Sequence, residues 1–388
     1  MKSNCKVLFI SFLVILVGCK ATPDIKKNNT TPTIFTLIDT QQFGTKPNII
    51  AVNKLFELDD KEKNKFNHFF DNPTNNKLSP HKRVFKYIDK KLKFFNYYGQ
   101  TYTAQNTINN NAGNCISLAI LTTAYAKLAN IDVNYSEVTT APVYFKNANF
   151  QLISNHVRTK LFDPNFKEAT NTVYFYKPGI IIDYFPSRNS WGSGIVNERE
   201  FIAMYYRNLS ATALQKDDLN LAAWNIVESL TFDASSISAI NMLAVIYRNM
   251  GLFEKSEMVY QYGLTLDAEN LNLLSNYHLL LSKLNRFDDA NKIQVKIDNA
   301  KDPSPFRWLI LADDYYQDNE YKRALKYYKK VIEIAPYLHH GYSGTAKSLF
   351  ALDKKNMAKK FMVIALEKTH EATQAKLYKA KLAILSKY

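Results

Sequence analysis

Cys115 is the residue whose position in this sequence best suits nucleophilic chemistry. It follows Gly113 and Asn114 and opens an apolar segment in which residues 116, 119, 120, 124 and 128 recur at helical spacing. Asn114 is a favoured N-cap residue, so the pattern predicts a buried helix with Cys115 in its first turn. The free amides and the positive end of the helix dipole favour a thiolate there. The alternative is a small cysteine that only packs the helix.

The amino terminus predicts export and lipidation. Lys2 and Lys6 flank the start, and residues 7–17 are apolar except for Ser11, a run too short to span a bilayer but suited to a signal peptide. The run ends in Leu-Val-Gly-Cys19, which resembles the lipobox of bacterial lipoproteins. The resemblance implies that residues 1–18 are removed and that Cys19 carries lipid.

The residue after Cys19 bears on location. It is Lys20, not aspartate, and this resembles the pattern that sorts lipoproteins to the outer membrane, facing the periplasm. In a cell without an outer membrane the prediction becomes the surface of the plasma membrane. Residues 19–45, rich in Thr, Pro, Lys and Asn, are predicted to be a tether.

Cysteine usage favours the nucleophile over the packing role. The chain has three cysteines, of which Cys5 lies in the leader and Cys19 carries the expected lipid. Cys115 is then the only thiol of the mature chain, without a partner for an intramolecular disulfide in a compartment that usually oxidises thiols. A lone thiol of this kind is a candidate reactive group.

Beyond the helix the hydrophobic pattern changes to that of strands. Residues 133–138, 143–145, 155–162, 172–176 and 180–185 form short apolar or alternating runs, separated by turn residues. The pattern predicts a small antiparallel sheet packed against the Cys115 helix. His156 falls at the start of one strand and Asp183 near the end of another.

Together these residues support a resemblance. The block Gly-Asn-Cys115-x-Ser, the His156 strand and the strand ending in Asp183-Tyr-Phe-Pro resemble the transglutaminase-like superfamily of papain-fold cysteine enzymes. The chain is more narrowly similar, over residues 80–388, to bacterial proteins that join such a domain to tetratricopeptide repeats. The resemblance implies that Cys115 is the nucleophile, His156 the general base and Asp183 the residue that orients the imidazole. Asp163 remains an alternative third member, and Gln105 is a candidate side-chain donor to an oxyanion.

The carboxy-terminal half repeats with a period of 34 residues. Repeats starting at 203, 237, 271, 305 and 339 all place a small residue at their twentieth position: Ala222, Ser256, Ala290, Ala324 and Ala358. This period and this pattern predict five tetratricopeptide repeats, closed by a helix over residues 372–388. Asn197 and Glu200 have capping-box spacing directly before the first repeat, so little linker separates the two halves.

Charge and motifs limit the classes of ligand. The formal net charge is +15. We interpret the lysines as spread along the chain without a compact basic cluster, so nucleic-acid binding is not expected. There is no CxxC or HExxH motif, so no metal site is expected, and no cofactor either. A protein or peptide is the expected ligand of the repeat groove.

The sequence thus predicts four parts. They are a signal peptide (1–18), a tether (19–45), an α+β papain-like domain (46–200) and an all-α repeat solenoid (201–388). The predicted function is that of a membrane-anchored cysteine hydrolase of peptidase or amidase type, whose repeats recruit a protein or peptide. The alternative is an inactive lipoprotein scaffold that mediates protein–protein interaction through the repeat groove.

Overall fold

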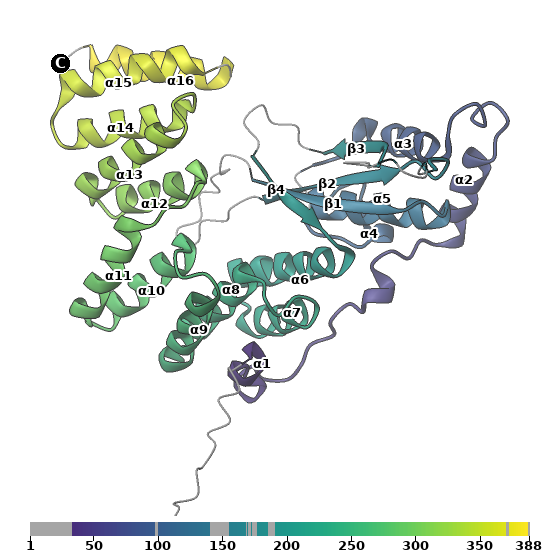
Figure 1. Ribbon diagram of the computed structural model, residues 1–388, viewed down its shortest axis with the longest axis horizontal. Coiled ribbons are helices and arrows are strands. Elements are labelled where there is room, and N and C mark those ends of the chain that lie inside the picture. The colour runs from purple at the N-terminus through teal and green to yellow at the C-terminus, as the bar shows by residue number, and fades with distance from the viewer. Residues whose placement is uncertain are drawn as a thin grey trace, which may run out of the picture.

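The computed structural model describes residues 33–97, 100–139, 155–167, 169, 172, 177–184, 191–369 and 372–386. The predicted signal peptide, Cys19 and the strand predicted at 143–145 lie outside these ranges, as does 173–176, most of the strand predicted at 172–176. The chain forms a domain with a small sheet and a long stack of helices (Figure 1). No helix in the described ranges has the length and apolarity that crossing a membrane requires.

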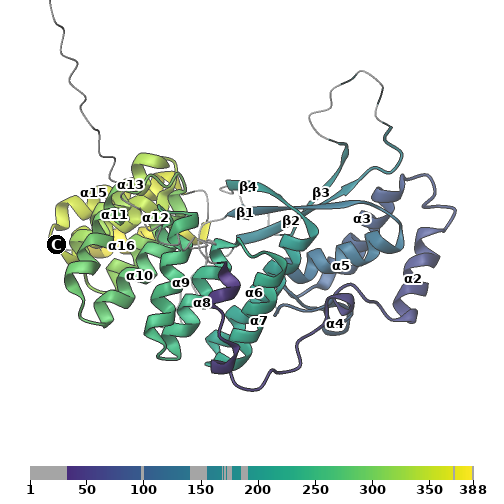
Figure 2. The ribbon, with the colours of Figure 1, turned by 60° about the horizontal axis from the view of Figure 1, so that its bottom comes forward.

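A four-stranded antiparallel sheet organises the first domain. Its strands lie in the order β3-β2-β1-β4, and their bounds are β1 Val133–Thr139, β2 Asn155–Phe162, β3 Gly179–Asp183 and β4 Trp191–Val196. The helices of this domain are α2 (Asp60–Phe70), α3 (Pro80–Lys91), α4 (Ala104–Asn110) and α5 (Cys115–Leu128). Helix α5 packs against β2 and α3 against β3, on one face of the sheet (Figure 2).

The apolar composition of α5 makes it the centre of this domain. Every residue from Cys115 to Ala126 is buried. A helix that is apolar on all sides needs cover on all sides, which the sheet, α3 and α4 provide. The predicted helix, and β2 over 155–162, are confirmed. Strand β4 was not predicted, because Gly192, Ser193 and Gly194 interrupt its apolar alternation. Gly194 has a φ of 126° and lies beside Ser193, the extra residue of β4 at a bulge opposite β1.

Five helix pairs form the second part. The pairs are α6 (Glu198–Gln215) with α7 (Leu219–Phe232), α8 (Ile237–Asn249) with α9 (Phe253–Leu266), α10 (Leu271–Lys283) with α11 (Phe287–Asn299), α12 (Pro305–Gln317) with α13 (Tyr321–Ile334), and α14 (His339–Ala351) with α15 (Lys355–Lys368). Helix α16 (Ala372–Leu385) closes the stack beside α15 (Figure 1). Four pairs begin at the predicted repeat starts; the first begins earlier, at a capping box formed by Asn197 and Glu200.

The turn inside each pair repeats the same backbone conformation. Residues with positive φ occur at Asp217, Gly251, Asn285, Asn319 and Asp353, which are 34 residues apart. Asn, Asp and Gly are the residues that adopt this left-handed conformation most readily, and it ends a helix. The small residues at the twentieth positions are all buried between helices. The period, the pairs and these turns identify the stack as a solenoid of tetratricopeptide type.

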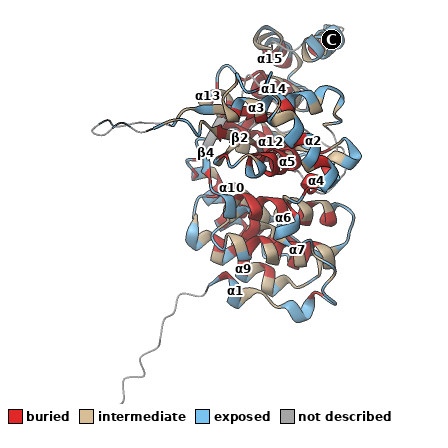
Figure 3. Ribbon diagram, turned by 90° about the vertical axis from the view of Figure 1, so that its right-hand side faces the viewer, coloured by how far each residue is buried: buried red, intermediate tan, exposed pale blue. Residues whose placement is uncertain are grey.

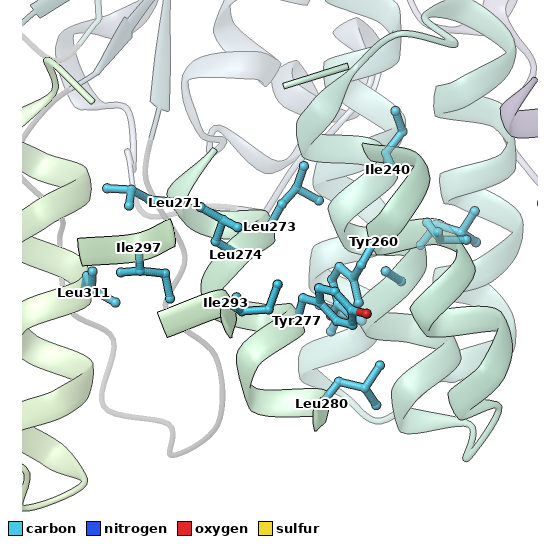
Figure 4. Close-up of a cluster of buried hydrophobic side chains, with 14 of the residues drawn as sticks. Ile240, Tyr260, Leu271, Leu273, Leu274, Tyr277, Leu280, Ile293, Ile297 and Leu311 are labelled. Atoms are coloured by element: carbon cyan, nitrogen blue, oxygen red, sulfur yellow. The ribbon is translucent and has the colours of Figure 1, made fainter. Parts of the chain in front are cut away.

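The solenoid core runs without a break through the first four repeats. Leu, Ile and Tyr side chains of successive pairs interdigitate between α8 and α12 (Figure 4), and buried positions follow the inner faces of the helices (Figure 3). Gln294 stands where the repeat pattern has an aromatic residue. Its amide bridges two phenols of the next pair, donating to Tyr327 over 2.8 Å and accepting from Tyr315 over 2.6 Å.

The last part of the predicted tether is packed on the solenoid. Helix α1 (Ile34–Leu37) and Phe43 lie against the first two repeats, and Ile34 and Phe43 are buried in the solenoid core. The backbone amide of Asp39 donates to the Tyr247 hydroxyl over 2.8 Å, and Lys255 pairs with the Asp39 carboxylate at 2.8 Å. The tether prediction therefore does not describe residues 34–43, where two apolar side chains are enough to fix the chain.

Helix α6 belongs to both parts. Its first half, including Phe201 and Tyr205, is buried in the core of the sheet domain, and its end, Ala213 and Leu214, in the solenoid core. Phe201 stacks on Tyr135 of β1 with ring centroids 3.9 Å apart. The two parts are therefore joined through one continuous helix rather than a linker.

Candidate active site

The amino terminus of α5 is built as the sequence predicts. Asn114 is the N-cap, and its side chain accepts a hydrogen bond from the backbone amide of Ser117 over 3.1 Å. Cys115 is therefore the first residue of the helix, where the backbone amides are unpaired. Glycine is required at position 113, because a Cβ there would lie 2.7 Å from the Ser117 Cβ.

A polar network fixes this helix start to the neighbouring chain. The Ser117 hydroxyl accepts from the backbone amide of Tyr102 over 2.8 Å. The side-chain amides of Asn114 and Asn208 both donate to the Thr101 hydroxyl, over 2.7 and 2.8 Å. Asn208 belongs to α6, so the first repeat takes part in holding the Cys115 segment. Thr101 and Asn208 were not predicted from the sequence, because no local pattern links residues so far apart.

The environment of the Cys115 sulfur opposes ionisation. The side chain is buried. Burial raises the pKa of the Cys115 thiol, and the negative charge of Asp183 adds to this, while backbone amides of Val157, Ile116 and Cys115 itself act in the opposite direction by hydrogen bonding. The helix start therefore does not by itself produce the thiolate that the sequence predicted. Ionisation of this sulfur requires a cation beside it.

His156 lies next to the sulfur along the chain of β2. Helix α5 packs against β2, and the backbone of Val157 lies near enough to the thiol to oppose the rise that burial causes in the pKa of Cys115. The His156 Cα is two covalent bonds from the Val157 nitrogen. In the sheet, His156 pairs with Val138 of β1. The backbone of β2 passes beside Cys115 at this point, and His156 as the general base stays a prediction, because its imidazole lies outside the described part of the structure.

Asp183 lies on the strand beside His156. It pairs in register with Arg158, two residues after His156, and the Arg158 Nε is 2.6 Å from the Asp183 Oδ2. Arg158 was not singled out from the sequence, although its position two residues after His156 in an alternating strand was a signal for it. The guanidinium fixes one carboxylate oxygen of Asp183 at the end of β3 nearest Cys115.

Asp163 does not belong to this site. It follows the last residue of β2, seven residues after His156, which at the rise of a strand is about 23 Å away. Its carboxylate lies 3.4 Å from the Nδ1 of His81, a buried histidine of α3. Of the two candidates for the third member, the geometry retains Asp183.

The side chain of Gln105 forms hydrogen bonds away from the Cys115 sulfur. Its Oε1 accepts from the backbone amide of Asp59 over 2.7 Å, and its Nε2 donates to the Asp59 carboxylate and to Asn109 over 3.0 and 2.9 Å. One amide donation joins α4 to the N-cap of α2, and the other lies within α4. The prediction of Gln105 as an oxyanion donor is therefore wrong. The backbone amides at the start of α5 are the donors that remain at the sulfur.

Comparisons with known proteins concern the helical repeats. No family model and no curated protein matches the chain. Among solved structures, the chain is similar to PilF of Pseudomonas aeruginosa, at 19% identity over 49% of this chain and 87% of that one, with a TM-score of 0.33. It is also similar to YrrB, titled a TPR protein with an unusual peptide-binding site, at 16% identity over 47% and 94% of the two chains, with a TM-score of 0.28.

A third similar structure is MamA of Desulfovibrio magneticus RS-1, at 14% identity over 44% of this chain and 96% of that one, with a TM-score of 0.29. The tetratricopeptide character of the solenoid rests on its own helix pairs and their period.

Proposed function

We propose that this protein is a cysteine hydrolase of the transglutaminase-like, papain-fold type, acting on peptide or isopeptide amides. The observation that carries the proposal is the packing of α5 against β2, because it places a helix-initial cysteine beside the strand that bears His156. Asp183 follows on the adjacent strand. Cysteine at a helix start, with His and Asp on neighbouring strands, is the arrangement that nucleophilic catalysis needs.

The electrostatics assign a specific role to His156. Since burial raises the pKa of Cys115, the neutral imidazole of His156 is the group that would take the thiol proton, and the resulting imidazolium would stabilise the thiolate. Asp183 then stabilises the imidazolium, and Arg158 holds that carboxylate in place. The backbone amides at the start of α5 would donate hydrogen bonds to the oxyanion of the tetrahedral intermediate.

Direct trapping of Cys115 tests the proposal. In a chain from residue 20, which contains every described helix and strand, Cys115 is the single cysteine. A small haloacetamide at pH 6 is expected to label the folded protein at Cys115 faster than the urea-unfolded protein, because an ordinary thiol is almost fully protonated at that pH. The measurement is peptide mapping by mass spectrometry, with Cys115→Ser as the unlabelled control.

The opposite order of rates would favour a second function, that of an inactive scaffold. The burial of Cys115 and the raised pKa of its thiol are the observations that favour the scaffold. In the scaffold the sheet domain only binds, and the solenoid presents its groove to a protein or peptide. Slow labelling of the folded chain and fast labelling after unfolding would leave this as the better account.

The proposed location is the bacterial cell envelope, with the chain anchored through lipid on Cys19 and facing the periplasm from the outer membrane. Metabolic labelling with a fatty-acid analogue is expected to tag the expressed full chain, and Cys19→Ala is expected to lose the tag and leave the membrane fraction. Cys5→Ala is the matched control and is expected to keep both. A Cys19→Ala chain that remains labelled would refute lipidation at this site.

A further inference from the structure

The positive charge of this protein is concentrated at one end. Residues 321–388 contain 15 lysines and arginines against 4 acidic residues, a net charge of +11, whereas residues 1–320 contain 35 against 31, a net charge of +4. The interpretation that lysine is spread along the whole chain is therefore wrong. The charged residues belong to the last two helix pairs and α16, at the free end of the solenoid (Figure 1).

The lysines of α13 and α15 gather on exposed helix faces. In α13, Lys322, Lys326 and Lys329 recur at intervals of four and three residues, and all are exposed, so they share one face. Lys359 and Lys360 are exposed in the same way on α15. Both are second helices of successive pairs, and in a regular stack such helices lie on the same side.

Most of this charge is not neutralised by the protein. Lys326 pairs with Asp298, at 2.8 Å. Among the residues that the structure describes, no carboxylate forms an ion pair with Lys322, Lys329, Lys359 or Lys360. A row of unpaired lysines repels itself, so an anionic partner gains attraction and also relieves that repulsion.

Aliphatic side chains are also exposed on α15 and on the adjoining α16. Met357 and Val363 on α15 are 46% and 38% exposed, and Leu377 and Ile384 on α16 are 46% and 55% exposed. Leu377 and Ile384 are seven residues apart, on one face of the closing helix. The aromatic residues of α13, α15 and α16 are not exposed, so the surface lacks the stacking platforms that single-stranded nucleic acids use.

We propose that the exposed faces of α13, α15 and α16, here called the basic end surface, dock on an anionic phospholipid surface. Lysines attract the phosphate headgroups, and the exposed Met, Val, Leu and Ile side chains enter the boundary between headgroups and acyl chains. Lysine is suited to this because its stem lies along apolar surface while its ammonium group stays in water. The contact is independent of the cysteine chemistry and adds a second attachment to the expected lipid on Cys19.

Vesicle sedimentation tests this surface. The unlipidated chain from residue 20 is mixed with phosphatidylcholine vesicles, with and without phosphatidylglycerol. Binding is expected only with phosphatidylglycerol, and it is expected to weaken as salt shortens the range of the attraction. Replacing Lys322, Lys329, Lys359 and Lys360 by glutamate is expected to lower the affinity by roughly fivefold per lysine, or several hundredfold together.

A matched control has the same change in charge elsewhere. Lys77, Lys82, Lys90 and Lys93 are exposed lysines around α3, and their replacement by glutamate is expected to leave vesicle binding within about fivefold of the parent. Equal losses in the two variants would show attraction by total charge and overturn the proposal, as would equal binding to vesicles without phosphatidylglycerol.

The aliphatic side chains distinguish lipid from other polyanions. Leu377→Ser with Ile384→Ser is expected to weaken vesicle binding several-fold, while unchanged circular dichroism shows that the solenoid remains folded. Tight binding of a DNA oligonucleotide that this double variant leaves unchanged, together with no binding to phosphatidylglycerol vesicles, would overturn the lipid proposal in favour of a nucleic-acid surface.

Discussion

Replacing Glu62 by glutamine is expected to lower the free energy of unfolding by about 3–5 kcal/mol. Glu62 lies in α2, and its Oε1 accepts hydrogen bonds from Tyr87 of α3 and Tyr125 of α5 over 2.7 and 2.8 Å, while Lys91 Nζ lies 2.7 Å away. The carboxylate thus joins α2 and α3 to the Cys115 helix. In Glu62→Gln the half-buried Lys91 loses its partner charge, and two buried phenols no longer donate to a carboxylate.

The same carboxylate predicts the direction of a pH effect. Burial opposes ionisation of Glu62, but hydrogen bonds from Lys91, Tyr87 and Tyr125 outweigh it and lower its pKa. A carboxyl whose pKa is lowered on folding contributes stability above the pKa of the unfolded chain and loses it as pH falls through the folded value. In urea unfolding, the free energy of unfolding of the wild type is therefore expected to fall as the pH is lowered from about 5. The Glu62→Gln variant is expected to lack this loss.

The control for Glu62 is Glu57→Gln. Glu57 pairs with Lys54 at 2.7 Å, but both side chains are at least half exposed, so the change is expected to cost less than about 1 kcal/mol. If the two variants had the same stability, the buried carboxylate would not be the junction of these helices.

Replacing His156 by alanine is expected to slow haloacetamide labelling of Cys115 in the folded chain at pH 6 by about 10²-fold or more. Burial and the charge of Asp183 raise the pKa of the thiol, so without the imidazolium the sulfur is protonated at that pH. Asp183→Asn is expected to slow labelling less, since it acts through the imidazole. The measurement is the rate of labelling between pH 5 and 9.

His68→Ala provides the comparison for His156. His68 is an exposed histidine of α2, outside the Cys115 site, and its loss is expected to leave the labelling rate unchanged. The His156→Ala profile is expected to move to higher pH, toward the behaviour of a buried thiol. Identical profiles for His156→Ala and wild type would remove the general base from the proposed mechanism.

Local patterns were sufficient for the elements that this site needs. The apolar run after Asn114 predicted α5, and the alternation of 155–162 predicted β2 with its observed bounds. The 34-residue period placed four of the five repeat starts, because each repeat must satisfy the same packing with its neighbours. In each of these features, many residues of one segment follow the same periodic pattern, so the pattern can be recognised without knowing any distant contact.

Contacts between distant residues were not predictable in this way. Gln105 has the chemistry of an oxyanion donor, but its side-chain amide donates to the Asp59 carboxylate and to Asn109 instead. The thiol pKa depends on burial by elements that a helix N-cap does not reveal. Residues 34–43 have a tether-like composition, yet Ile34 and Phe43 find a site on the solenoid.

The continuity of α6 has a thermodynamic consequence. Because one helix contributes Phe201 and Tyr205 to the sheet domain and Leu214 to the solenoid, neither core can open without exposing apolar surface of the other. Melting of the two parts is then coupled, and a compound bound at Cys115 or a peptide bound in the repeat groove raises the same transition temperature. A single thermal-shift screen of the intact chain therefore reports ligands of both parts, before the substrate or the partner is known.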